Sequence, residues 1–252
     1  MLRKFYVKFI LSYPKSILLI MIICIAALGY QARYLEIDAS AETLLLEDDK
    51  DLAFTRIVNE RYGNSDFLIL TYTPKGDLLA DATLNSLRKL SAELLELKRV
   101  ESVVSILNVP LLESPPKPVK ELLKNIPTLE SPEIDKALAK EEFLNSPIYR
   151  DNLVSPDFKT TALLINLHDD PLYRELLQQR NSLRKKEKEK TLSIVEQQEL
   201  EKVLLDFKNH RDKMRLVEHE NISLVREIAE KYRGDAKIFL GGASMVADDL
   251  IT

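Results

Sequence analysis

The stretch DFLILTY, residues 66–72, decides the fold, because it is apolar and rich in residues that favour β-strands. The turn sequence PKGD follows it at residues 74–77. A helix is expected next, capped by Asp81 or Thr83 and running to about Lys98, since its leucines recur at steps of three and four. Further apolar runs predict strands over residues 100–109, 160–167 and 237–240.

Two segments separate these strands. Prolines punctuate residues 110–156, which predicts a covering segment with short helices at 119–125 and 132–138. Residues 171–233 are helical in pattern and highly charged, with a break at 191–193. Ser193 and Glu196 have the spacing of a capping box. We therefore expect a helical hairpin whose second helix is the longer one.

The resulting order is βαββαβ, the ferredoxin-like split arrangement of four strands with helices on one face. The fold class is therefore α+β, with a proline-rich insertion and a long charged hairpin. The expected divisions are an N-terminal segment at 1–36, a connector with a short helix at 37–64, the α+β domain at 65–242 and the start of another helix at 243–252.

The N-terminal segment contains ILLIMIICIAALG, residues 17–29, without a charged side chain. Basic residues precede it: Arg3, Lys4, Lys8 and Lys15. This pattern predicts a transmembrane helix with a cytoplasmic N-terminus, and so a single-pass protein of the bacterial inner membrane with a periplasmic body. A cleaved signal peptide has a similar pattern and stays open as an alternative, as does a buried core helix of a soluble protein.

Composition and motifs argue against several functions. The net charge of −4 gives no basic field for nucleic acid. Cys24 is the only cysteine, and the three histidines have no metal-binding spacing. The cluster His168-Asp169-Asp170 could form an acid–base or metal site, but a helix cap and turn before Pro171 explain it better. The acidic run 47–51 lacks the glycine and terminal glutamate of a calcium loop. We expect no enzyme, cofactor or metal, and no substrate-binding residue can be assigned.

Several local motifs occur in an order that resembles the RND superfamily of transporters, in its MMPL and hopanoid-exporter branch, which is related to sterol-sensing-domain proteins. They are DASAE at 38–42 with Leu46 and Asp48-Asp49, YGNSD at 62–66, VESVVS at 100–105, and Gly241-Gly242 with Asp248. The resemblance implies one membrane helix followed by a porter-type domain, the opening part of a proton-driven exporter of lipids or other hydrophobic compounds. It implies as partners the lipid bilayer, the remaining membrane portion or a second subunit, and hydrophobic cargo.

Proton relay in that family depends on acidic residues within the membrane, and residues 1–34 contain none. The chain is therefore not expected to transport alone. The alternative is a free-standing, membrane-anchored extracytoplasmic binding or assembly protein that docks a partner through its charged hairpin.

Overall fold

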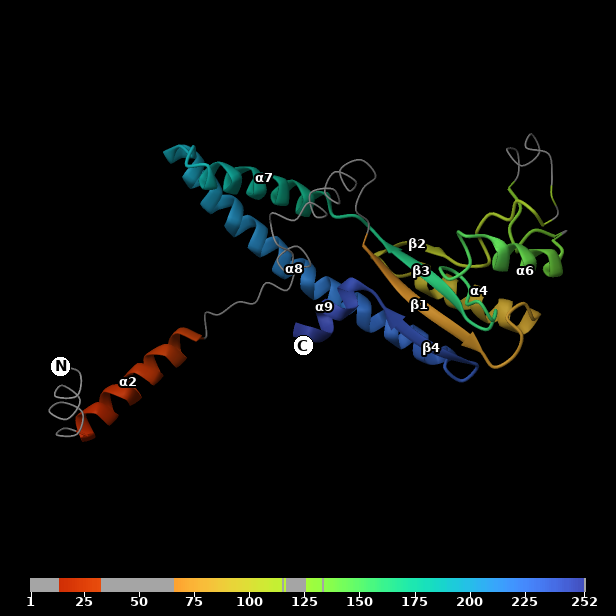
Figure 1. Ribbon diagram of the computed structural model, residues 1–252, viewed down its shortest axis with the longest axis horizontal. Helices are drawn as coiled ribbons and strands as arrows, with labels where there is room; N and C mark the ends of the chain where they lie inside the picture. Colours follow the sequence, from red (N-terminus) through yellow and green to blue (C-terminus); the bar gives the residue numbers. More distant parts are fainter. Residues whose placement is uncertain (1–13, 33–65, 115, 117–125, 133, 252) are drawn as a thin grey trace. The chain divides into compact units, whose positions relative to one another are not determined.

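A computed structural model describes residues 14–32, 66–114, 116, 126–132 and 134–251 (Figure 1). The chain divides into two compact units, Met1–Leu46 and Glu47–Thr252. The connector with its short helix at 37–64 and the short helix expected at 119–125 lie outside the described residues.

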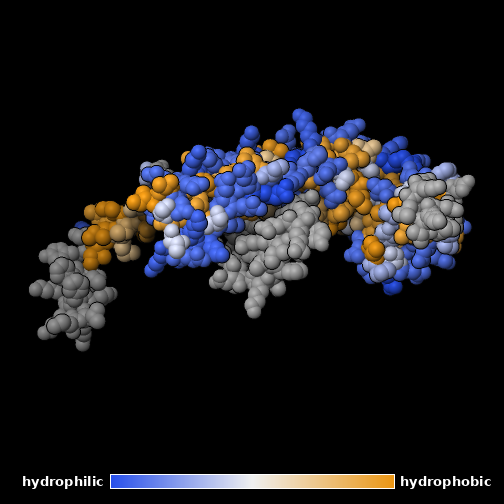
Figure 2. All heavy atoms as spheres, turned by 90° about the horizontal axis from the view of Figure 1, so that it is seen from above, coloured by the Kyte–Doolittle hydropathy of each residue, from blue (hydrophilic) through white to orange (hydrophobic). Residues whose placement is uncertain are grey.

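The described part of the first unit is the helix α2, Pro14–Ala32, whose surface is hydrophobic (Figure 2). None of the helices formed by the described residues is long and apolar enough to cross a membrane. The predictions of a transmembrane helix and of a single-pass inner-membrane protein are therefore wrong. The physical reason is length: the apolar run 17–29 spans only about 20 Å as a helix, whereas the hydrocarbon layer is about 30 Å thick.

Four strands form the sheet of the second unit: β1 (Phe67–Pro74), β2 (Val100–Val104), β3 (Thr161–Leu167) and β4 (Ala236–Gly241). Their order in the sheet is β2-β3-β1-β4, and every neighbouring pair is antiparallel. The helix α4 (Asp81–Leu95) connects β1 to β2, and α8 (Ile194–Tyr232) precedes β4. The α+β class and the βαββαβ order expected from the sequence are therefore present in this unit.

Alternate side chains of the strands build the core. In β1, Leu68, Leu70 and Tyr72 are buried, and so are their counterparts in β3, where Leu163 and Ile165 lie on the same face. This face packs against α4 and the C-terminal half of α8, which contact each other as well as the sheet (Figure 1). The opposite face of the sheet carries the remaining, more exposed side chains.

Two boundaries differ from the sequence prediction. The N-cap of α4 is Ala80, without a side-chain cap, because the Thr83 hydroxyl donates instead to the Asp77 carbonyl oxygen at 2.8 Å. The strand β2 ends at Val104 rather than at Val109, since the Asn108 side chain closes a turn onto the Ser105 amide at 2.8 Å. Local hydrogen bonds by short polar side chains thus replace regular structure at both places.

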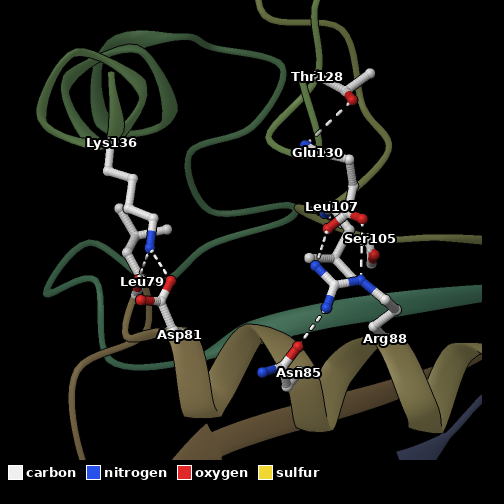
Figure 3. A network of polar contacts seen from close by, with 9 residues as sticks. All are labelled: Leu79, Asp81, Asn85, Arg88, Ser105, Leu107, Thr128, Glu130 and Lys136. Carbon is white, nitrogen blue, oxygen red and sulfur yellow. Dashed lines mark hydrogen bonds and ion pairs between the residues drawn. The ribbon is translucent and has the colours of Figure 1, made fainter. Parts of the chain in front are cut away.

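The described part of the proline-rich segment contacts the N-terminal half of α4. Its helix α6 spans Lys136–Asn145 instead of the expected 132–138, because Asp135 is the residue that caps it, accepting from the Ala137 amide at 2.8 Å. Figure 3 shows how side chains fix this segment to α4: Arg88 donates to both carboxylate oxygens of Glu130, and Lys136 donates to Asp81 at 2.6 Å.

The last helix, α9 (Ala243–Ile251), follows β4 directly, as the sequence predicts. Gly242 makes the turn with a φ of +137°, a backbone conformation that residues other than glycine rarely adopt. A Cβ atom at this position would lie 3.0 Å from the Phe67 carbonyl oxygen. The glycine therefore allows α9 to begin close against the start of β1.

Candidate functional site

The most distinctive element outside the sheet is a hairpin of two helices, α7 (Pro171–Lys188) and the N-terminal half of α8 (Figure 1). Its turn, residues 189–193, falls at the break expected from the sequence. Buried Leu183 of α7 packs there with Leu200 and Val203 of α8. This small cluster is separate from the core of the sheet, to which Ile222, Val225 and Ile228 of α8 belong. The helix α8 therefore contributes buried side chains to two separate hydrophobic cores.

The predicted capping box at the start of α8 is confirmed. The Ser193 hydroxyl accepts from the Glu196 amide at 3.3 Å, and the Glu196 carboxylate accepts from the Ser193 amide at 2.9 Å. Lys186 of α7 donates to the same carboxylate at 2.5 Å. Lys186 first, and then the Ser193 backbone and hydroxyl, lower the pKa of Glu196 to about 2. The cap therefore also joins the two helices at the turn.

Aromatic contacts hold the other end of α7. The ring of Tyr173 lies 5.3 Å from that of Phe207, and the guanidinium of Arg180 lies 4.5 Å from the centre of the Phe207 ring. The Arg180 side chain is buried, and its guanidinium lies over the face of the Phe207 ring, which attracts the positive charge. These contacts continue the packing of the hairpin toward the sheet.

The cap expected at Asp170 is confirmed, because its carboxylate accepts from the Tyr173 amide at 2.9 Å. Its second oxygen lies 2.7 Å from Nε2 of His210, on α8. Asp169 pairs with Arg174, whereas His168 is exposed and uses its backbone amide to bond the Arg99 carbonyl oxygen at 2.8 Å. Of the three residues His168, Asp169 and Asp170, Asp170 is the one whose side chain contacts α8 in the described part of the chain.

Further polar contacts surround the point where α8 leaves the sheet. Nδ1 of His219 lies 2.8 Å from Asp248 of α9, and Arg226 donates to Asp249 at 2.7 Å. Arg99, the residue before β2, lies 3.9 Å from Glu218 of α8. We call His210, Asp170, Glu218, Arg99, His219 and Asp248 the base cluster. It connects α7, α8, α9 and the sheet.

Burial shifts the pKa of Glu218. Desolvation, followed by the charge of Asp66, raises the pKa of its carboxyl, although Arg99 opposes the shift. The same main cause, desolvation by burial, raises the pKa of the nearby Asp66 carboxyl. Burial therefore favours the neutral form of Glu218, although its side chain is about one third exposed.

The base cluster contains two histidine–aspartate pairs. Among the residues described, no group of three or more His, Cys, Asp or Glu side chains could hold a metal ion. The pair of His210 and Asp170 has the geometry of a base with its orienting carboxylate. Within the described residues, neither member of the pair has a hydrogen bond to a serine or cysteine side chain, so we interpret the pair as a structural link between α7 and α8.

A second candidate surface is the outer face of the sheet. Phe67, Ile69 and Phe239 are exposed there to 46%, 36% and 56%. Cross-strand register places Ile69 opposite Leu164, and Thr71 opposite both Ala162 and Phe239. We call Phe67, Ile69, Ala162, Leu164 and Phe239 the open face. These apolar side chains lie on three neighbouring strands, with Thr71 between Ala162 and Phe239, and such a surface is suited to contact with another apolar surface or molecule.

Sequence reasoning located neither surface completely. Alternation within each strand gives the open face once the strand pairing is known. The base cluster, in contrast, joins residues as distant in the chain as Arg99 and Glu218.

A search of protein-family models finds no match for this chain, and no curated protein matches it.

Proposed function

We propose that the α+β domain acts as a porter-type domain of an RND-type exporter and contacts lipids or other hydrophobic compounds. The observation that supports this best is the βαββαβ sheet with the order β2-β3-β1-β4, since the resemblance implies such a domain here. The proposal concerns this domain only and assigns no transport to the chain by itself, because residues 1–34 lack the acidic side chains of a proton relay.

The open face is the surface that we assign to the hydrophobic cargo. It presents aromatic and aliphatic side chains on neighbouring strands, with Phe239 more than half exposed. Lys237 lies at its edge, with its ammonium group 5.0 Å from the centre of the Phe239 ring. An amphipathic molecule could place its chain across the open face and an acidic headgroup at Lys237.

Photo-crosslinking tests this proposal. A fatty acid that carries a diazirine is added to the full chain, and the labelled peptides are identified by mass spectrometry. We expect label on β1, β3 and β4, and a loss of most of this label in the variant Phe239→Ser. Leu216→Ser is the matched control, since Leu216 is also an exposed large apolar residue, at 72%, but lies on α8. Absence of label from all three strands would contradict the proposal.

A second candidate function is that of a binding or assembly protein that docks a partner through the hairpin. The exposure of Ile194 and Val195 at its turn, 78% and 73%, favours this function. Removing residues 171–233 is not a suitable test, because Val225 and Ile228 of α8 belong to the core of the sheet. Substitutions confined to the turn leave that core intact.

A further inference from the structure

The end of the hairpin at the turn exposes two large apolar side chains that its own packing does not use. Ile194 and Val195 are the first two residues of α8, and they are 78% and 73% exposed. The packing of the hairpin comes instead from Leu183, Leu200 and Val203, which are buried. The two exposed side chains therefore do not stabilise the hairpin and are free to contact another surface.

A mainly basic stretch precedes these side chains in the sequence. The stretch RKKEKEK at 184–190 has five basic and two acidic residues, a local excess of three positive charges in a chain with a net charge of −4. Lys186 is joined to Glu196 by an ion pair, whereas Arg184 and Lys185 are exposed on the last turns of α7. We call residues 184–195 the hairpin tip.

The size of the tip indicates the kind of partner. A stable protein–protein interface buries about 800 Å² on each side, which is about 20 or more residues. The tip offers two apolar side chains and a few basic ones at the end of a pair of helices. Binding to a lipid surface needs a smaller contact area. A few apolar side chains enter the layer beneath the headgroups, while nearby lysines bind anionic headgroups.

We propose that the hairpin tip binds the surface of an anionic lipid layer, with Ile194 and Val195 inserted among the headgroups and Arg184 and Lys185 on the anionic groups. This inference rests on the second candidate function, docking through the hairpin, and names its partner. The helix α7 has 18 residues and so holds the tip about 27 Å from its own start beside the sheet. The contact is therefore independent of cargo binding at the open face.

A fluorescent probe at the tip tests the proposal in the full chain. In a Cys24→Ser background, Ile194→Cys is labelled with an environment-sensitive dye, and Leu216→Cys, at a position of similar exposure on the same helix, is the matched control. Vesicles contain phosphatidylcholine alone or phosphatidylcholine mixed with phosphatidylglycerol. A response at position 194 without one at position 216 distinguishes contact by the tip from general recruitment of the chain to the vesicles.

We expect a blue shift at position 194 with the anionic vesicles only, and none at position 216. The double variant Arg184→Gln with Lys185→Gln should weaken this response about 25-fold, since each basic residue near an anionic surface contributes about fivefold. High salt should reduce it in the same direction. Circular dichroism checks that both labelled variants keep their helices.

Three results would overturn the proposal. No shift at position 194 with either vesicle shows that the tip does not bind lipid. Equal shifts with both vesicles show that the basic residues have no part in binding. A shift with soluble polyglutamate but not with vesicles identifies an acidic protein as the partner instead. None of these results bears on labelling of the open face, so failure here and failure of the porter proposal are distinguishable.

Discussion

Glu142 shows how a single buried carboxylate organises the proline-rich segment. Its side chain, in a residue that is 8% exposed, accepts from the amides of Leu112 and Glu113 at 2.6 and 3.0 Å and from the Ser114 hydroxyl at 2.7 Å. Three donors from consecutive residues therefore converge on one carboxylate. The segment after β2 needs this partner because it has no strand to satisfy its amides.

We expect Glu142→Ala to lower the free energy of unfolding by about 3 kcal/mol, because it leaves one buried and two partly buried donors without their acceptor. Chemical denaturation followed by circular dichroism measures the change. Glu141→Ala is the matched control, since this neighbouring residue is exposed, and it should change stability by less than about 0.5 kcal/mol. Equal effects of the two substitutions would show that the three hydrogen bonds contribute nothing.

Glu218 gives a pH dependence whose sign follows from its raised pKa. Burial penalises the ionised form, so the folded state binds the proton more tightly than the unfolded state does. The cost of ionisation is therefore present above the folded pKa, and it disappears as the pH falls below the ordinary value of 4.5.

We expect Glu218→Gln to raise the midpoint of thermal unfolding at neutral pH and to have no effect well below the ordinary pKa. Thermal melts of both proteins over a pH series test this. Glu220→Gln, two residues away and exposed, is the control and should show no such trend. A variant that is less stable than the parent at neutral pH would mean that the contact with Arg99 outweighs the burial of the charge.

At the scale of the element, the sequence predicts α8 well because its signals are local. Ser193 and Glu196 define its start, and the break before them separates it from α7. The strands are equally clear, since alternation in β1 and β3 matches their burial. The wrong boundaries arise where a distant or competing bond decides: Thr83 bonds Asp77 rather than capping α4, and Asn108 ends β2 early.

We expect Ser193→Ala to speed amide exchange in the first turns of α8 about fivefold, which corresponds to a loss of about 1 kcal/mol for an N-cap. Hydrogen exchange measured by mass spectrometry resolves this segment. Ser182→Ala within α7 is the control, because alanine is a good helix former and no cap is lost there. Unchanged exchange at residues 194–199 would contradict the prediction.

The same cap has a pH dependence of the opposite sign to that of Glu218. The pKa of Glu196 is lowered to about 2, chiefly by Lys186. Its contribution is therefore complete above the ordinary value of 4.5 and is lost as the pH falls toward about 2. An NMR titration of the carboxyl should give this low midpoint, and Lys186→Gln should raise it. A midpoint near 4.5 in the parent chain would show that the contact is not formed in solution.

At the scale of the molecule, the sequence predicts the order of strands and helices but not which side chains the helices bring together. The base cluster depends on the rotation of α8, which places His210 toward α7 and His219 toward α9. No local pattern specifies that rotation. The prediction for the N-terminal segment failed for a different reason: composition and basic residues favoured a membrane span, but the apolar run is too short, and no helix of the described residues meets that requirement.

The two cores along α8 make a prediction for the whole molecule. Val203 lies in the hairpin cluster and Val225 in the core of the sheet, and both are buried, at 5% and 0%. Each Val→Ala change should cost about 2 kcal/mol by loss of buried methyl groups and the resulting cavity. Because the clusters are separate, the cost should appear in different parts of the chain.

We expect Val203→Ala to speed amide exchange only in α7 and in the first half of α8, while the strands and α4 keep their protection. Val225→Ala should instead speed exchange throughout the sheet and α4, since these elements share its core. The two variants remove the same atoms from the same helix and so serve as controls for each other. If Val203→Ala loosened the sheet as much as Val225→Ala does, the hairpin and the sheet would form one cooperative unit. The hairpin could then not move or unfold independently while the sheet keeps its shape.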